Sequence, residues 1–235
     1  MVRRLAESAL FFREYIRHFH TTGAVLPSGR FLAAALARFV AQGKGDRSNL
    51  CAAPSGPFRQ IGPVPFSQPR RILEVGPGTG AVTRRIVRGM GSDDQLDLVE
   101  LNGTFVRQLE RRFRTEPAFR AVADRARIHH CPIEELPGGE SYDAIVSGLP
   151  LNNFSVADVE RILAVLTDRL APQGMLSFFE YIAVRPARAL LGGRAERVRL
   201  RAIGRAMNAV FDRHEIRRDA VWLNVPPAWV HHLRK

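Results

Sequence analysis

Three closely spaced glycines with an acid on either side are the part of this chain best suited to hold a ligand. The run is Glu74-Val75-Gly76-Pro77-Gly78-Thr79-Gly80, and Glu100 follows 20 residues after Gly80. Glycines let the backbone approach a ligand closely and adopt dihedral angles that other residues avoid. The helix expected directly after them offers free N–H groups and a positive dipole end. These residues therefore predict a cradle for a nucleotide-type cofactor.

The order of the residues distinguishes two kinds of cofactor. The NAD-type fingerprint is G-x-G-x-x-G and needs no acid before it, whereas this chain reads E-x-G-x-G-x-G. That order resembles motif I of class I S-adenosylmethionine (SAM) methyltransferases. In those enzymes the first acid lies near the amino-acid end of the cofactor, and the acid ending the second strand binds the ribose hydroxyls. Glu74 and Glu100 fit these two positions. An ordinary strand–helix turn, or another nucleotide-type cofactor, is the alternative.

Two later loops are expected to border the same ligand. The first is Cys131-Pro132-Ile133-Glu134, and in this kind of fold it flanks the adenine ring. Ile133 could pack on the ring face, and Glu134 or a backbone N–H group could bind the ring edge. A plain turn that opens a short helix, with Glu134 near its positive end, is the alternative.

The second loop, residues 147–154, reads Ser-Gly-Leu-Pro-Leu-Asn-Asn-Phe and is expected beside the transferable methyl group. Adenine-N6 methyltransferases of RNA and DNA have a polar residue and then x-Pro-aromatic here, and they stack the target base on the aromatic ring. This chain has Leu151 at the aromatic position, and Phe154 comes three residues later. The loop therefore looks related to those enzymes but lacks the residue that would stack a base.

The elements that position these loops follow from the pattern after residue 70. Strand-length apolar stretches alternate with helix-length segments, which predicts a parallel sheet with right-handed crossovers. Ligands of such sheets bind beyond the carboxyl ends of the strands. We expect a Rossmann-like class I SAM methyltransferase fold, with a mostly parallel seven-stranded sheet and helices on both faces. Strands are expected over residues 71–76, 96–100, 126–130, 142–147, 175–182 and 216–223, and helices over 80–90, 102–115, 156–170 and 194–212.

Residues 1–42 are expected to form an N-terminal helical cap in front of a linker at 43–69 and the methyltransferase domain at 70–235. Residues 5–20 predict an amphipathic helix with an aromatic face beside basic residues, a composition typical of helices in a membrane interface. Packing on the domain body is the alternative for this face. Ser28 could cap a second helix from Arg30 to Val40. The residues of the first helix expected to contact membrane or substrate are Phe12, Arg13, Tyr15, Ile16, Arg17 and Phe19.

Composition points to an anionic partner. The chain has 35 Lys and Arg against 23 Asp and Glu, a formal net charge of +12. The tract 185–218 holds ten arginines and three acids, a net +7, and its apolar spacing predicts a helix with a buried stripe. Nucleic acid or an acidic membrane surface would suit such charge, although a GC-rich genome, which encodes Arg where other genomes encode Lys, explains part of it. Two cysteines, Cys51 and Cys131, provide neither a disulfide framework nor metal-ligand spacing, which favours a reducing cytoplasm.

Taken together, the motifs resemble those of the bacterial phospholipid N-methyltransferases. The similar segments are Gly23-Ala24-Val25-Leu26-Pro27-Ser28-Gly29, the glycine run, Val99-Glu100-Leu101-Asn102, Val146-Ser147-Gly148-Leu149-Pro150-Leu151 and Trp222-Leu223-Asn224-Val225-Pro226-Pro227-Ala228. The resemblance implies stepwise methylation of the amine of phosphatidylethanolamine toward phosphatidylcholine, with SAM converted to S-adenosylhomocysteine. The cofactor contacts it implies are Ser28, Glu74, Gly76, Pro77, Gly78, Gly80, Glu100, Leu101, Pro132, Ile133, Glu134, Ser147, Gly148 and Leu149.

Glu180 and Tyr181, at the end of the strand expected over 175–182, are the candidate catalytic residues. A lipid amine is mostly protonated at neutral pH, so it must lose a proton before it can accept a methyl group. Glu180, Tyr181 or solvent could take this proton, and the family commonly has Thr or Ser where this chain has Glu180. Asn153 and Arg185 are further candidates for substrate contact, and arginines of the basic tract could hold the lipid phosphate.

We expect a monomer in the cytoplasm, peripheral on the inner face of the membrane, without a membrane span and without a metal. Two other functions remain open. An RNA adenine-N6 methyltransferase would explain the charge and the fold, and a non-catalytic SAM-binding membrane protein would explain the absence of an evident base.

Overall fold

A seven-stranded sheet runs through the chain, as the sequence predicts. The computed structural model describes residues 29–41, 69–182 and 193–235. In the described part the strand order is β3-β2-β1-β4-β5-β7-β6, and only the pairs made by β7 are antiparallel. The strands are β1 (Arg71–Val75), β2 (Gln95–Val99), β3 (Ala126–His129), β4 (Tyr142–Ser147), β5 (Leu170–Tyr181), β6 (Glu215–Val221) and β7 (Ala228–Arg234).

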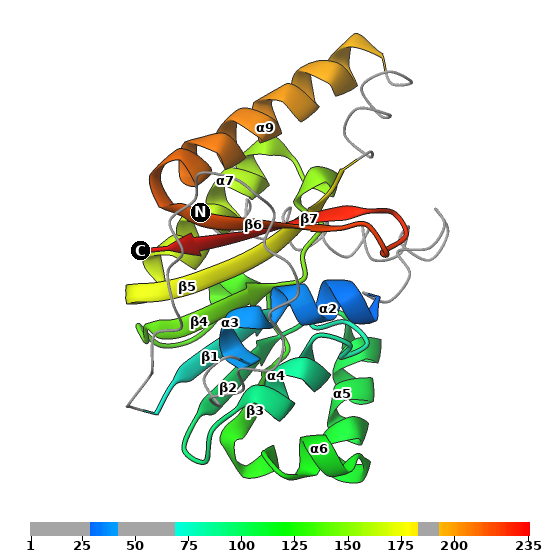
Figure 1. Cartoon of the computed structure of the whole chain (residues 1–235), viewed down its shortest axis with the longest axis vertical. Coiled ribbons are helices and arrows are strands. Elements are labelled where there is room, and N and C mark those ends of the chain that lie inside the picture. Colours follow the sequence, from blue (N-terminus) through cyan, green and yellow to red (C-terminus); the bar gives the residue numbers. More distant parts are fainter. Residues whose placement is uncertain (1–28, 42–68, 183–192) are drawn as a thin grey trace.

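Helices cover both faces of this sheet (Figure 1). One face carries α2 (Arg30–Leu36), α3 (Arg38–Ala41), α4 (Thr83–Gly89), α5 (Gly103–Thr115) and the short α6 (Pro117–Arg120). The other face carries α7 (Val156–Asp168) and α9 (Arg194–His214). Two apolar cores result. Leu32, Leu36 and Ile86 contribute to the first, and Ile162, Ile203 and Met207 contribute to the second. The described part of the predicted cap therefore shares a core with the sheet.

Several element boundaries predicted from the sequence differ from those in the structure. The helix expected over 30–40 breaks at Ala37 into α2 and α3. Its N-cap residue is Gly29 rather than the expected Ser28, and the Gly29 N–H donates to Asn224 Oδ1 over 3.1 Å. Strand β5 begins at Leu170 rather than at 175, because Leu170 already pairs with Tyr142 of β4. The pairing shifts register before Met175, and Gln173 in this irregular stretch has a left-handed φ of 65°.

Strand β7 was missed altogether. Its sequence, Ala-Trp-Val-His-His-Leu-Arg, follows two prolines and contains two histidines, which are polar signals for a loop. Both histidines are buried and have partners. His232 Nδ1 lies 2.8 Å from Ser177 Oγ, and His231 Nδ1 lies 2.5 Å from Glu215 Oε1. Buried polar groups can sit inside a sheet when they are hydrogen-bonded, so the histidines do not interrupt β7.

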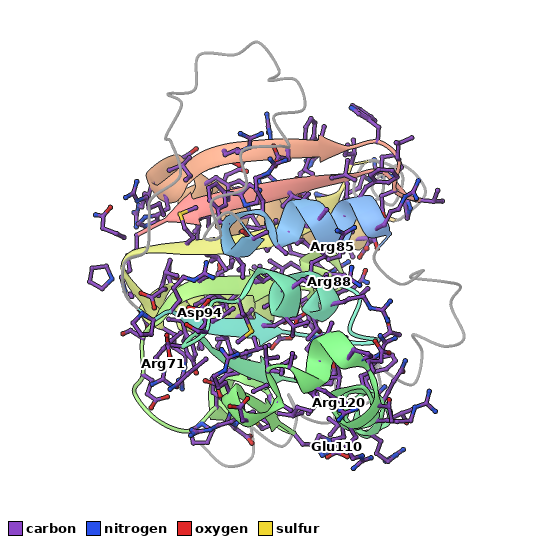
Figure 2. All side chains as sticks on the ribbon, turned by 60° about the horizontal axis from the view of Figure 1, so that its bottom comes forward. Arg71, Arg85, Arg88, Asp94, Glu110 and Arg120 are labelled. Atoms are coloured by element: carbon purple, nitrogen blue, oxygen red, sulfur yellow. The ribbon has the colours of Figure 1, made fainter. Side chains whose placement is uncertain are left out.

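Arg70 and Asp94 form a buried ion pair that fastens α3 and α4 to the sheet. Arg70 Nη2 lies 2.5 Å from Asp94 Oδ2, and the guanidinium also donates to the carbonyls of Val40 and Gly89. Burial alone would raise the pKa of Asp94, but hydrogen bonds from Arg70 and Gly91 hold that pKa below its ordinary value. Figure 2 shows Asp94 at the same edge of the sheet as Arg71, which is the edge where β1 begins.

We expect Asp94→Asn to lower the free energy of unfolding by about 3 kcal/mol, because it leaves a buried guanidinium without its carboxylate. Urea unfolding measures the loss. The matched control is Asp93→Asn, since Asp93 is the exposed neighbour and bonds only Ser92 Oγ among the contacts described. Equal effects of the two substitutions would contradict a stabilising role for the buried pair.

Candidate functional site

The glycine run forms a tight loop between β1 and α4. Gly76, Gly78 and Gly80 have φ angles of 71°, 54° and 79°, in the left-handed region that favours glycine. A Cβ placed on Gly78 would meet nothing within 4 Å, so open space lies in front of the middle of the loop. The glycine loop therefore has the conformation that the predicted cradle requires, although α4 begins at Thr83 rather than at residue 80.

The loop after β4 packs directly against the glycine loop. The Gly148 N–H donates to Val75 O over 2.8 Å, and a Cβ on Gly148 would come within 2.5 Å of Gly76 O. On the other side, a Cβ on Gly76 would come within 2.8 Å of Leu149 Cδ2. Two segments more than seventy residues apart thus meet at the carboxyl edge of the sheet, as expected for Ser147, Gly148 and Leu149.

Glu100 braces the glycine loop from the end of β2. Its Oε2 accepts the Gly78 N–H over 2.9 Å, and its Oε1 accepts the Asn102 N–H over 2.8 Å. Burial raises the pKa of Glu100, and these hydrogen bonds partly oppose the rise. Each carboxylate oxygen has a second lone pair, so the group can still accept ribose hydroxyls. Leu101 follows it and is partly exposed.

Glu74 lies beneath the same loop and is 1% exposed. Burial raises its pKa to about 8, interactions with Thr83 lower it, and repulsion from Glu100 adds to the rise. Within the described residues its Oε2 is buried and accepts no hydrogen bond. A buried carboxyl with an unused oxygen suits a cationic group, so these residues fit the ammonium and sulfonium end of SAM.

We expect Glu74→Gln to stabilise the cofactor-free chain by an amount that grows between about pH 5 and pH 8. The folded pKa of about 8 lies above the ordinary 4.5, so between these values the unfolded chain loses the proton more readily. Stability therefore falls as pH rises through this window and is level above it, whereas glutamine does not titrate. Urea unfolding across the window tests this. Glu110→Gln, at an exposed position on α5 (Figure 2), is the control. If the difference in unfolding free energy between the wild type and the Glu74→Gln chain did not depend on pH, the raised pKa of Glu74 would be contradicted.

The loop expected beside adenine is only partly accessible. Ile133 is 2% exposed and packs in the core of the α7 face. It is the first residue of a 3₁₀ turn over Ile133–Glu135, and Pro132 precedes this turn. The side chain of Ile133 fills the core rather than an open surface. Glu134 Oε2 is buried and accepts no hydrogen bond in the described part of the chain. Contact of these residues with adenine stays a prediction.

No aromatic ring is exposed in the loop after β4. Leu151 and Phe154 are 2% and 0% exposed, and both belong to the core of the α7 face. Arg199 on α9 fixes this conformation, since its guanidinium donates to the carbonyls of Asn152 and Phe154. This arginine of the basic tract thus has a structural role. The expected absence of a base-stacking residue after Pro150 agrees with this geometry.

Glu180 and Tyr181 extend beyond the carboxyl end of β4. Ser147, the last residue of β4, pairs with Phe178, so Glu180 lies two residues further along β5. Tyr181 packs on the core of the α2 face and makes an edge contact with Phe179, with ring centroids 5.1 Å apart. Glu180 Oε1 lies 3.6 Å from Nε2 of His231. The side chains of Glu180 and Tyr181 therefore lie on opposite faces of the sheet.

His231 is a residue that the sequence reasoning missed. It stands between two carboxylates, with Nδ1 2.5 Å from Glu215 and Nε2 3.6 Å from Glu180. Its ring stacks on Phe211 with centroids 4.1 Å apart. Because β7 was not predicted, no signal placed this histidine near the candidate base. The only hint of a functional histidine here was the adjacent pair His231-His232, and the sequence around it does not have the spacing of a metal site.

Several predicted contacts lie outside the described residues. They are Phe12, Arg13, Tyr15, Ile16, Arg17, Phe19, Ser28 and Arg185. Asn153 is described, and it lies in a 3₁₀ turn over Leu151–Asn153. Within the ranges that the structure covers, no helix is long and apolar enough to cross a membrane. In the same ranges, no three His, Cys, Asp or Glu side chains gather as a metal site would require.

Comparison with known proteins agrees with this geometry. Residues 72–174 match the family model described as a methyltransferase domain. An ornithine lipid N-methyltransferase from Singulisphaera acidiphila is 30% identical over 125 residues, which cover 52% of this chain and 65% of the relative. The match therefore spans slightly less than two thirds of that protein.

Solved structures show the same fold at low sequence identity. An O-methyltransferase from Bacillus cereus in complex with S-adenosylhomocysteine (SAH) aligns with a TM-score of 0.59 at 13% identity, over 97% of this chain and 91% of that one. An O-methyltransferase of tomaymycin synthesis from Streptomyces achromogenes, in complex with SAM, aligns with a TM-score of 0.56 at 14% identity, over 98% and 89%. The chain has the Rossmann-like fold of the class I SAM methyltransferases, so the predicted fold is confirmed, and the geometry of the glycine run and of Glu100 fits the predicted SAM cofactor.

Proposed function

We propose that this chain transfers a methyl group from SAM to the amine of a membrane lipid, with phosphatidylethanolamine as the first candidate and an ornithine lipid as the second. The observation that carries the substrate class is the 30% identity to an ornithine lipid N-methyltransferase. The family resemblance of the sequence segments at 23–29 and 147–151 supports phosphatidylethanolamine. Both lipids offer a primary amine on a head group, so one site could accept either.

The site supplies positioning and a proton acceptor rather than a nucleophile. When bound, SAM supplies a methyl group on a sulfonium, a good electrophile that needs an aligned neutral amine. Gly76, Gly148 and Leu149 close the carboxyl edge around the cradle, which aligns the reactants and limits water. The lipid ammonium must give up one N–H proton to become the neutral amine whose lone pair forms the bond to carbon.

Glu180 is the proton acceptor in this proposal. It lies beyond the end of β4 and beside His231, whose other nitrogen contacts Glu215. Glu215 is partly exposed at the start of β6 and holds the imidazole at Nδ1. The 3.6 Å between Nε2 and Glu180 is longer than a hydrogen bond, so proton exchange with Glu180 requires the two side chains to move closer or a bridging water. Carboxylate, imidazole and carboxylate thus form a path from the carboxyl edge of the sheet toward solvent.

An anionic membrane surface is the proposed partner. The net charge of +12 favours it, and exposed arginines such as Arg85 and Arg88 on α4 lie beside α2 (Figure 2). The amphipathic helix predicted over residues 5–20 would add a second contact, and it lies outside the described residues. Peripheral attachment at the cytoplasmic face belongs to the same proposal.

A binding mode that stacks a nucleic-acid base has less support. Base-methylating enzymes need an exposed ring beside the methyl group, and here Leu151 and Phe154 are in the core. The observed contacts therefore favour the lipid over RNA.

Transfer of radiolabelled methyl from SAM tests this function. The full chain is mixed with vesicles that contain phosphatidylethanolamine or ornithine lipid, with and without an anionic lipid, and with structured RNA in the same tube. We expect label in the lipid extract and more of it when anionic lipid is present. Label in the RNA alone would overturn the proposal, and SAM binding without any transfer would favour a non-catalytic protein.

A further inference from the structure

The turn between β6 and β7 presents three large apolar side chains to solvent. Trp222, Leu223 and Val225 are 64%, 74% and 72% exposed. Among the described residues, the other large apolar side chains classed as exposed rather than partly buried are Phe31 and Val198. Apolar exposure concentrated in one short turn is costly in water and marks an interaction surface. We call Trp222, Leu223 and Val225 the hairpin tip.

The hairpin tip is held in place by its buried neighbours. Asn224 is 6% exposed, its Nδ2 donates to Pro226 O over 2.8 Å, and its Oδ1 accepts the N–H of Gly29 at the start of α2. The Ile182 N–H donates to Pro227 O over 2.9 Å. The apolar side chains therefore project from a fixed turn that is anchored to both α2 and β5, which reduces the entropy lost on binding.

The hairpin tip lies at the same edge of the sheet as the candidate active site. Ala228 at the start of β7 pairs with Tyr181 at the end of β5, and Trp229 pairs with Glu180. The Trp222 and Trp229 rings make an edge contact with centroids 6.2 Å apart. Directly paired residues of antiparallel strands point to the same face, so an aromatic strip leads from exposed Trp222 to the proposed base. Figure 1 shows the turn beside the first turn of α2 at this end of the sheet.

Arg218 borders the aromatic strip, and Arg30 lies on the opposite face of the sheet, next to Gly29, which bonds the turn. The Arg218 guanidinium lies 4.7 Å from the centre of the Trp229 ring, and the Arg30 guanidinium lies 4.7 Å from the centre of the Phe31 ring. Both arginines are exposed. Tryptophan and aliphatic side chains beside arginine are the residues that enter the head-group region of a bilayer, where arginine meets lipid phosphate.

We propose that the hairpin tip inserts into the head-group region of an anionic bilayer and thereby presents a lipid amine to Glu180. The choice of lipid rests on the proposed function, but insertion of the tip does not depend on methyl transfer. A bilayer suits the geometry because the tip is a projecting turn with apolar side chains at its end and cations behind it. The aromatic strip formed by Trp222 and Trp229 then leads from the membrane surface to Glu180, the proposed proton acceptor.

Binding of the full chain to vesicles of phosphatidylcholine and phosphatidylglycerol tests the inference. The variant replaces Trp222, Leu223 and Val225 by serine and keeps Asn224, so the turn retains its hydrogen bonds. We expect vesicle affinity to fall by at least about tenfold. In a second measurement, a Trp229→Phe chain leaves Trp222 as the sole tryptophan, and its emission should shift to the blue and be quenched by brominated lipid.

The matched control is Val198→Ser, which removes an exposed apolar side chain from α9, and it should leave vesicle affinity unchanged. Methyl transfer by the hairpin variant to vesicles should fall in step with its vesicle affinity, and transfer by the wild-type chain is measured in parallel on vesicles and on a short-chain, water-soluble phosphatidylethanolamine. Unchanged vesicle affinity of the hairpin variant, or no change in Trp222 emission, would overturn the inference. Absence of transfer by the wild-type chain to either form of lipid would instead refute the proposed function.

Discussion

A Gly148→Ala chain is expected to bind SAM about 10²-fold more weakly than the wild type. The new Cβ would lie 2.5 Å from the carbonyl oxygen of Gly76, closer than atoms can approach, and the obstacle is backbone that cannot rotate away. The glycine loop and the loop after β4 must therefore move apart. Since the two loops together form the cradle, a shift of either one misplaces the groups that hold the cofactor. Isothermal titration calorimetry with SAM measures the change.

The control for this substitution is Gly139→Ala. A Cβ at Gly139 meets nothing within 4 Å, so SAM affinity and melting temperature should both stay at wild-type values. The melting temperature of the Gly148→Ala chain separates local displacement from unfolding. Wild-type SAM affinity in a folded Gly148→Ala chain would show that the contact between the two loops does not shape the cofactor site.

A Glu180→Gln chain is expected to lose about 10²- to 10⁴-fold in kcat while its SAM affinity stays unchanged. Glutamine keeps the size of the side chain but cannot accept the amine proton. The contact with His231 at 3.6 Å would lose its charge, so the pH dependence of kcat should also change. Methyl transfer to the lipid amine, followed over a range of pH, provides both readouts.

Glu160→Gln is the control for Glu180→Gln, because Glu160 is an exposed glutamate on α7. It should leave kcat and its pH profile as in the wild type. His231→Gln adds a second comparison, with a smaller loss in kcat, since it breaks the path to Glu215 but keeps Glu180. A Glu180→Gln chain with wild-type kcat would remove Glu180 as the proton acceptor.

The central part of the fold was predictable because local and global signals agree there. Strands β1, β2 and β4 are mostly apolar and mostly buried, as expected for strands covered on both faces, and each precedes a loop with a distinct motif. The glycine run required left-handed φ angles, and the structure has them at Gly76, Gly78 and Gly80. Glu100 could be placed because parallel strands bring their carboxyl ends to one edge.

The edge of the sheet that holds β7 was not predictable in the same way. His231 and His232 are buried only because Glu215, Ser177 and Asp219 come to them from other strands. No spacing in the sequence reveals partners that are 13 to 55 residues away. The path from Glu180 through His231 to Glu215 was invisible for the same reason.

The hairpin tip shows a related limit of the sequence. The motif at 222–228 was recognised as a point of family resemblance, but its exposure could not be inferred from residue types. Apolar residues such as Trp222 and Leu223 predict burial when taken alone. Their exposure follows from the buried amide of Asn224, which holds the turn against Gly29 and Pro226.

The position of the transferred methyl group in the product tests the central claim most directly. The full chain is incubated with SAM that carries a deuterated methyl group and with anionic vesicles that contain the candidate lipids, and the products are fragmented by mass spectrometry. We predict that the label is found on the head-group nitrogen of a lipid. Label on an oxygen, or on no lipid at all while SAM is bound, would contradict lipid N-methylation.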